Sequence, residues 1–357
     1  MEFKRVLAVA LVTVAVFALM PFDAVQASDS SVSPYESQLD EYAAPVYGEV
    51  CKATEITDAT REFTVSYNVA QPTRLFNSED ALDSYAYNMV RNALTAVYLT
   101  EPMVPYIWDF PVSDVKVTAV SASVGITSGD DKTMSYALDR VTFSLSVPEW
   151  ITADSMNELK QAINDIKIVG NNKSQQVVNI MEQLDKLAFE ADGDGEISNI
   201  YDALVKKKTT SAGVSQAFIE LCSFCGVPAI TVAGENVFAT NESKDFWNYV
   251  YLEGELDGGP GYAWYIVDPG YCNGTGIAGY STPVEHEGRT YSMSSAHNVD
   301  LSAAGLSDLE VPQVNKDKYV QVGGPTFLEQ HGEKLLLLAL AIVLGVGMYY
   351  AIRTGNY

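Results

Sequence analysis

The sequence has few basic residues. Its 357 residues include 22 Lys and Arg against 46 Asp and Glu, which gives a formal net charge of −24. Nucleic-acid-binding proteins need a basic surface to meet the phosphates, so this composition argues against DNA or RNA as a partner. The chain also lacks a phosphate-binding loop, a dinucleotide fingerprint and an internal repeat. The acidic balance suits a solvated surface outside the cytoplasm.

Cysteine is also scarce, with four residues in the chain. Cys222 and Cys225 form one CxxC, but no second CxxC exists, which argues against a zinc site. The pair falls inside a predicted helix, whereas a redox CxxC needs its first cysteine at a helix N-terminus. In an exported protein, Cys51, Cys222, Cys225 and Cys272 are disulfide candidates, and they allow three pairings. We predict one disulfide from Cys272 to Cys222 or Cys225.

The two ends of the chain predict a membrane-anchored protein. Residues 1–27 combine Lys4 and Arg5 with an apolar run and small residues before Ser28, which is typical of a signal peptide; an uncleaved N-terminal anchor is the alternative. Residues 335–352 carry no charge and are long enough to span a bilayer as a helix. We therefore expect a single-pass protein of the cell membrane with a cytoplasmic tail at 353–357. The bulk of the chain is extracytoplasmic, where other cell-envelope proteins are possible partners.

The stretch from Thr209 to Asp268 has the most specific pattern in the chain. Val214, Phe218, Leu221 and Cys225 give one apolar helical face, and Gly226 and Pro228 end the helix. A short strand follows at 230–233. Two further strands, 246–252 and 262–267, flank a glycine-rich loop and predict a hairpin. Because paired antiparallel strands bring the start of one to the end of the other, we expect Asp245 to lie near Asp268.

These motifs resemble the transglutaminase-like superfamily, whose fold is papain-like. The resemblance covers about sixty residues and rests on Gly213, Leu221, Gly226-Val227-Pro228, Trp247-Asn248 and Trp264-Tyr265-Ile266-Val267-Asp268-Pro269. It implies an α+β fold in which a helix packs on an antiparallel sheet. It also implies a catalytic triad of a cysteine at the helix start, a histidine on the first hairpin strand and an aspartate after the second.

The triad positions hold other residues here. Alignment of the motifs places Ser211 at the cysteine position and Asp245 at the histidine position, and only Asp268 is kept. A serine nucleophile needs a base, usually histidine, and none of the three histidines (His286, His297, His331) falls in the motif. A carboxylate is a weak base for serine. Ser211 is therefore interpreted as a helix N-cap, with a serine nucleophile as the alternative.

The remaining chain divides into segments of different composition. We predict a flexible lead-in at 28–48, a small α+β domain at 49–150, the transglutaminase-like domain with its leading helices at 151–282, and an extended tail at 283–334. Within them the patterns predict helices at 78–99, 152–168, 175–189 and 197–208, and a hairpin of strands 115–126 and 140–147.

An acidic loop precedes the last of these helices. Glu190, Asp192, Asp194 and Glu196 lie in a DGDG pattern that partly matches a calcium loop, with Tyr201 where the bidentate carboxylate belongs. A plain acidic turn is the alternative, and no other cofactor is expected. Asn172, Asn241 and Asn273 begin glycosylation sequons.

Together these patterns predict a surface-exposed transglutaminase-like protein that has lost catalysis and has a binding or structural role at the cell envelope. The alternative is a hydrolase or acyltransferase of the same lineage that uses Ser211 with Asp245 and Asp268. A third possibility is a cation-dependent surface module that uses the acidic loop or the aspartate pair.

Overall fold

The computed structural model describes residues 33–56, 61–110, 115–128, 131–189, 198–239, 245–270 and 276–322. The expected signal peptide at 1–27, the acidic loop at 190–196 and the apolar run at 335–352 lie outside these ranges. Within the described ranges, no helix combines the length and the apolar character that a bilayer crossing requires. The membrane span therefore stays a prediction.

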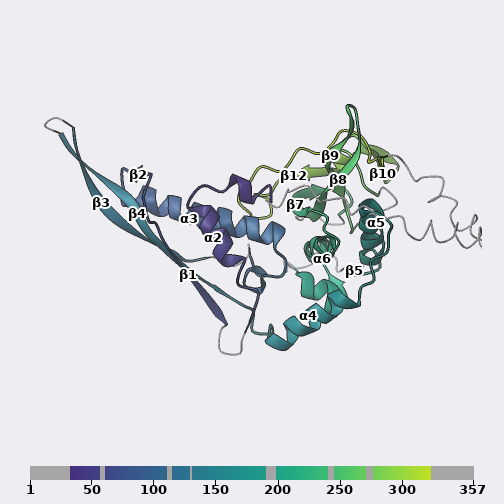
Figure 1. Ribbon diagram of the computed structural model, residues 1–357, viewed down its shortest axis with the longest axis horizontal. Helices are drawn as coiled ribbons and strands as arrows, with labels where there is room; N and C mark the ends of the chain where they lie inside the picture. Colours follow the sequence, from purple (N-terminus) through teal and green to yellow (C-terminus); the bar gives the residue numbers. More distant parts are fainter. Residues whose placement is uncertain are drawn as a thin grey trace, which may run out of the picture. The chain divides into compact units, whose positions relative to one another are not determined.

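A four-stranded antiparallel sheet, the central sheet, is formed by strands from the green and yellow part of the chain (Figure 1). Its strands run in the order β12 (His297–Val299), β7 (Ala229–Asn236), β8 (Asp245–Leu256) and β9 (Gly259–Val267). Helix α6 (Ser211–Phe224) packs against β7 and β8, and α5 (Lys173–Leu184) packs against α6. The fold is thus mixed helix and sheet with antiparallel pairing, as the sequence predicted for the core.

Helix α6 ends where the sequence predicts. Gly226 follows the helix with a φ of 63°, a left-handed conformation that glycine adopts without steric cost. The amide of Val227 donates to the carbonyl of Cys222 (2.9 Å), which closes the last turn. The Asn248 amide on β8 donates to the carbonyl of Ser215 (3.0 Å), so a buried hydrogen bond joins helix and sheet.

A second antiparallel sheet precedes this core. Strands β3 (Val117–Ser128) and β4 (Asp131–Ser146) form a long hairpin. Strands β1 (Glu62–Asn68) and β2 (Leu75–Phe76) pair with the edge of β4 that faces away from β3. Helix α3 (Glu79–Thr100) packs against β3 and β4, with Ser78 as its N-cap. The predicted helix and hairpin are both present, and the strands run closer to the turn than expected.

The other elements precede, connect or follow the strands of these two sheets. They are η1 (Glu36–Gln38), α2 (Ala43–Val50), η2 (Pro105–Ile107), α4 (Ala153–Asp165), β5 (Ala188–Phe189), η3 (Asp202–Lys206), β6 (Lys208–Thr209), β10 (Pro283–His286), β11 (Arg289–Ser292) and α7 (Met293–Ala296). Strand β5 pairs with β6 in parallel, and β10 pairs with β11 antiparallel. The helix predicted at 197–208 is shorter, and its described part includes a π-helical turn at η3.

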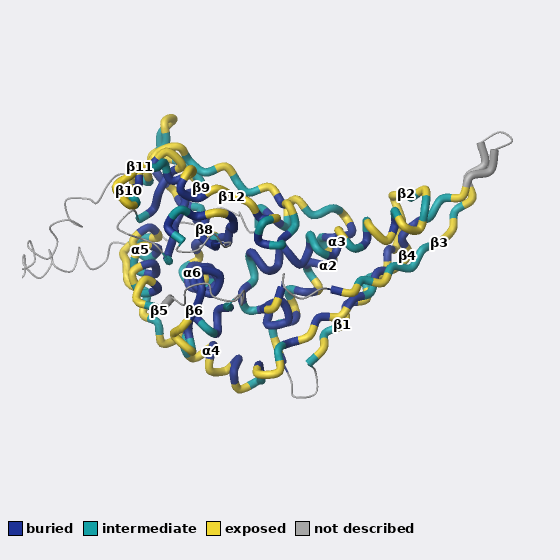
Figure 2. Tube along the Cα trace, turned by 180° about the vertical axis from the view of Figure 1, so that it is seen from behind, coloured by how far each residue is buried: buried dark blue, intermediate teal, exposed yellow. Residues whose placement is uncertain are grey.

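The predicted flexible lead-in (28–48) and the predicted extended tail (283–334) are both folded where the structure describes them. In the lead-in, Tyr35 is fully buried and its hydroxyl donates to the carbonyl of Thr231 in the central sheet (3.0 Å). In the tail, β12 joins the sheet, and the Asn315 amide donates to the carbonyl of Trp264 (2.8 Å). Their polar composition concealed a few aromatic and aliphatic residues, which Figure 2 shows as buried stretches. Buried side chains from Tyr35 to Leu309 form one core cluster.

Candidate functional site

Ser211 is the first residue of α6, and its side chain faces the central sheet. It is 6% exposed, and Thr210 occupies the N-cap position. The Ser211 hydroxyl accepts a hydrogen bond from the amide of Phe246 on β8 (3.2 Å) and hydrogen-bonds to the Asp245 carboxyl. The N-cap interpretation is therefore wrong, because this hydroxyl binds the neighbouring strand and not an amide of its own helix.

Asp245 and Asp268 meet at the end of the β8–β9 hairpin, and a third residue joins them. The Asn236 side-chain amide, at the end of β7, donates to one oxygen of each carboxylate, at 3.0 Å for Asp268. The backbone amide of Phe238 donates to Oδ1 of the Asn236 side chain (3.0 Å). This hydrogen bond fixes the orientation of the side-chain amide of Asn236. The predicted proximity of the two aspartates is present, and Asn236 is a bridging residue that sequence reasoning missed.

A histidine completes this buried cluster from the far edge of the sheet. His297 on β12 places Nε2 2.8 Å from Oδ2 of Asp268 and Nδ1 3.2 Å from the carbonyl of Met293. The Trp247 and Phe238 rings lie 5.0 and 5.6 Å from the imidazole, between ring centroids. The sequence analysis did not assign His297 to the site because no local motif predicts that β12 pairs with β7. Its only signal was the rarity of histidine in the chain.

The hydrogen bonds constrain where the protons lie. The Met293 carbonyl can only accept, so Nδ1 of His297 carries a proton. Both oxygens of Asp268 accept hydrogen bonds, one from the Asn236 side-chain amide and the other from the Gly270 backbone amide (3.1 Å).

Asp245 is in a different electrostatic state. Burial, as the larger cause, and the neighbouring Asp268 carboxyl together raise the pKa of its carboxyl to about 7, while the hydrogen bonds to Ser211 and Asn236 act in the opposite direction. Near neutral pH, Asp245 therefore holds a proton for much of the time.

This geometry differs from a working serine triad in one respect. Both nitrogens of His297 are engaged, by Asp268 and by a backbone carbonyl, so the imidazole has no free nitrogen to accept a proton from Ser211. The group in contact with the Ser211 hydroxyl is Asp245. A proton transfer from Ser211 would thus require a carboxylate as base.

The described residues among the other predicted site residues take no part in this cluster. Cys222 is buried in the core, and Cys51, Cys222 and Cys225 carry no disulfide among the described residues. Cys272 lies outside those residues, so its predicted disulfide stays a prediction. Asn172 caps α5 by accepting from the Gln175 amide (2.9 Å). Glu190, Asp192, Asp194, Glu196, Asn241 and Asn273 also lie outside the described residues. Within those residues, no group of three His, Cys, Asp or Glu side chains is arranged to hold a metal ion.

Comparisons with known proteins give partial structural likeness only. No family model matches the sequence, and no similar curated protein was found. A candidate cysteine protease from Cytophaga hutchinsonii is 11% identical over 60% of this chain and 78% of its own, with a TM-score of 0.26. A protein named as a TGase is 11% identical over 58% of this chain and 56% of its own, with a TM-score of 0.28.

A third similar structure is the periplasmic domain of TgpA from Pseudomonas aeruginosa. It is 13% identical over 62% of this chain and 90% of its own, with a TM-score of 0.21. The first two of these structures are named as a candidate cysteine protease and a TGase. At such low TM-scores they say nothing about activity, so the functional argument rests on the chain's own residues.

Proposed function

We propose that this chain is a membrane-anchored surface protein whose transglutaminase-like domain has lost the family's catalysis and serves binding or structure at the cell envelope. The observation that carries the proposal is the hydrogen-bonding of the side chains at the triad positions. Ser211 accepts from the Phe246 amide, and the imidazole of His297 is engaged at both nitrogens. Each of these polar groups binds a neighbour within the protein, and His297 has no free ring nitrogen to activate Ser211.

A structural role explains the same contacts. The cluster joins the start of α6, the ends of β7, β8 and β9, and the edge strand β12 through buried hydrogen bonds. Buried polar groups that are fully satisfied fix the relative placement of the elements that carry them. On this proposal, the residues at the triad positions keep their places, and their hydrogen bonds hold helix α6 against the central sheet.

One observation favours the alternative, a hydrolase or acyltransferase that uses Ser211. Burial and the Asp268 charge raise the pKa of Asp245 to about 7, which is where a general base is most effective at neutral pH. Asp245 also contacts the Ser211 hydroxyl directly. Against this stands the near-complete burial of both residues, at 6% and 1% exposure, which restricts access of any acyl donor to Ser211.

Labelling with a serine-reactive fluorophosphonate separates the two functions. The full-length protein in a neutral detergent is incubated with the probe, and Ser211→Ala serves as the matched blank. We expect no labelling at Ser211, with an active serine hydrolase labelled in the same tube to show that the probe is competent. Stoichiometric modification of Ser211 that disappears in Asp245→Asn would overturn the proposal in favour of the enzyme.

A further inference from the structure

The long hairpin carries an open strand edge beside a groove. Strand β3 pairs with β4 on one side, and among the described residues no strand pairs with its other side. No backbone hydrogen bond from residues 117–125 to a described segment other than β4 is present. Alternate amides and carbonyls of β3 therefore point outward without a backbone partner among the described residues, and such an edge is the template that an added strand needs.

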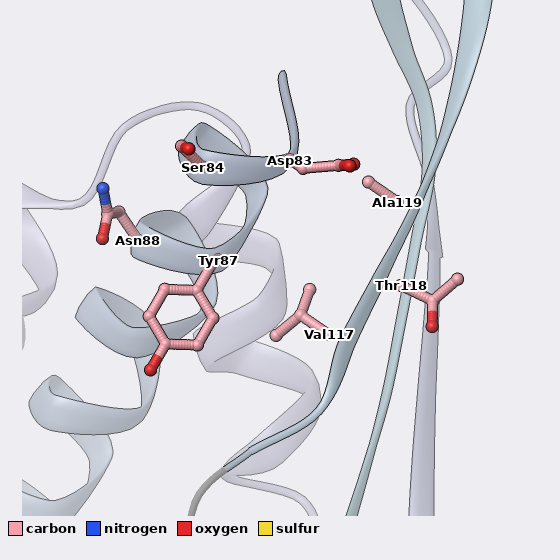
Figure 3. A pocket seen from close by; sticks show the side chains of 7 residues that line it. All are labelled: Asp83, Ser84, Tyr87, Asn88, Val117, Thr118 and Ala119. Atoms are coloured by element: carbon pink, nitrogen blue, oxygen red, sulfur yellow. The ribbon is translucent and has the colours of Figure 1, made fainter. Parts of the chain in front are cut away.

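The groove lies between this edge and helix α3. Its volume is about 590 Å³, its helix side is lined by Asp83, Ser84, Tyr87 and Asn88, and Figure 3 shows Asp83 directed toward β3. On the strand side, Val117 and Ala119 point toward the helix, and Thr118 points away. A segment that extends the sheet beyond β3 would place every second side chain into this groove, because side chains alternate along a strand.

Asp83 is the one charged residue among those that line the groove, and Lys116 is exposed next to Val117 in the chain. Asp83, Ser84 and Asn88 are exposed, and Glu79 and Asp80 are exposed one turn earlier on the same helix. Within the described part of the chain, no ion pair involves Asp83. The cation on this helix, Arg91, donates to the Gly305 carbonyl and lies over the Tyr87 and Phe110 rings. The groove therefore offers a carboxylate to a basic side chain.

We propose that β3 and α3 together bind an extended basic segment of another protein by strand addition. The segment pairs with the outward amides and carbonyls of Val117–Val120, up to the bulge that shifts the register between Val120 and Ser121. Its Lys or Arg side chains enter the groove and reach Asp83. Its intervening apolar side chains lie on the opposite face of the sheet, the face toward which Thr118 points. A second copy of this chain fits less well, because its net charge of −24 opposes an acidic groove. The proposal does not depend on whether Ser211 reacts.

The test uses a fluorescein-labelled octapeptide of alternating Lys and Val and the full-length protein in a neutral detergent. Binding is followed by fluorescence anisotropy at low ionic strength. We expect the Lys-Val peptide to bind and a Glu-Val peptide of the same length not to bind. A Lys-Val peptide with alternate amides N-methylated keeps the charge but cannot form the ladder, so we expect it to lose binding. Equal binding of the methylated and unmethylated peptides would overturn strand addition.

Two charge reversals locate the site. Asp83→Lys should weaken binding of the Lys-Val peptide about tenfold, because an attraction becomes a repulsion at a partly solvated site. Asp257→Lys, in the exposed β8–β9 turn, makes the same change in net charge and should alter the dissociation constant by less than about twofold. Equal effects of the two variants would mean that only the overall charge matters, which would refute the groove. A wild-type chain that sediments as a dimer and binds peptide only on dilution would assign the edge to a second copy and also refute the proposal.

Discussion

At the scale of the single residue, Ser211 joins the start of α6 to the neighbouring strand β8. In the family that the motifs resemble, this position carries a nucleophile at a helix start. Here the hydroxyl is 6% exposed and links Phe246 and Asp245, both on β8, to the helix. A hydroxyl that both accepts and donates inside the protein is stabilised in its resting state and is held less ready for attack on an outside group.

The first prediction concerns the removal of this hydroxyl. Ser211→Ala leaves the Phe246 amide without its side-chain acceptor and should lower the free energy of unfolding by about 1–3 kcal/mol. Ser223→Ala, at an exposed position of the same helix, is the matched control and should change it by less than about 0.5 kcal/mol. Urea unfolding followed by circular dichroism measures both. Equal stability of Ser211→Ala and wild type would argue against a structural role for the hydroxyl.

The second prediction concerns the pH dependence that Asp245 introduces. Burial raises its pKa in the folded protein to about 7, above the value of about 4 in an unfolded chain. The folded state thus retains a proton that the unfolded state releases between these values. The stabilisation is complete below about pH 4 and is lost as the pH rises through about 7. This loss amounts to at most about 4 kcal/mol, since one pKa unit corresponds to about 1.36 kcal/mol.

The comparison with Asp245→Asn isolates this contribution. Burial also raises the pKa of Glu101 and of Glu220, so other groups contribute a slope of the same sign. The variant cannot titrate at position 245 and should lose less stability than wild type between pH 4 and pH 8. The free energy of unfolding is measured in urea at both pH values. Parallel profiles for variant and wild type would show that Asp245 has no unusual pKa.

At the scale of the element, strand β12 is the piece that completes the cluster. It pairs with β7 in the register His297–Asn236 to Val299–Gly234, and this pairing carries the imidazole to Asp268. The two strands lie so close at Gly234 that a Cβ atom there would overlap the Asn298 carbonyl. The absence of a side chain at Gly234 is therefore a condition for the placement of His297.

The third prediction follows from this close approach. Gly234→Ala should displace β12, separate His297 from Asp268 and cost about 1–3 kcal/mol of stability. Hydrogen exchange should show faster exchange of the Asp300 amide, which donates to the Ala233 carbonyl in the native sheet (3.0 Å).

A second glycine provides the control. A methyl group added at Gly48 in α2 would meet no neighbouring atom within 4 Å, so Gly48→Ala should leave exchange in β12 unchanged and stabilise the helix by about 0.5–1 kcal/mol. Unchanged exchange at Asp300 in Gly234→Ala would show that β12 tolerates the extra methyl group and does not depend on the glycine.

At the scale of the whole molecule, the fourth prediction concerns membrane topology. The signal-like residues 1–27 and the uncharged run 335–352 predict that the folded body lies outside the cell membrane. Protease treatment of intact cells should therefore remove the body and leave a small C-terminal remnant that includes the span. An epitope tag after Tyr357 should stay protected until the cells are lysed.

This experiment has two controls, a cytoplasmic marker protein in intact cells and protease treatment of lysed cells. The cytoplasmic protein must remain intact in whole cells, and both the body and the tag must be digested after lysis. Complete protection of the body in intact cells would contradict the topology, whereas digestion of the tag in intact cells would place the C-terminus outside.

The sequence by itself determined the local elements and their order in the core. The apolar spacing of α6, Gly226 at its end and the two β-rich runs around a glycine-rich loop each depend on neighbours within a few residues, so their patterns are visible in the chain. The proximity of Asp245 to Asp268 followed from the same local logic, because a hairpin sets its own register.

Only the tertiary structure decided which residues complete the cluster. Asn236 and His297 come from β7 and β12, and nothing near them in the sequence specifies that these strands pair. The same holds for Tyr35, which is buried against Thr231 although its segment has a polar composition. Long-range pairing depends on the burial of surfaces that are brought together only when the whole chain folds. His297 therefore reaches the site from strand β12, which lies in a segment that the sequence predicted to be an extended tail.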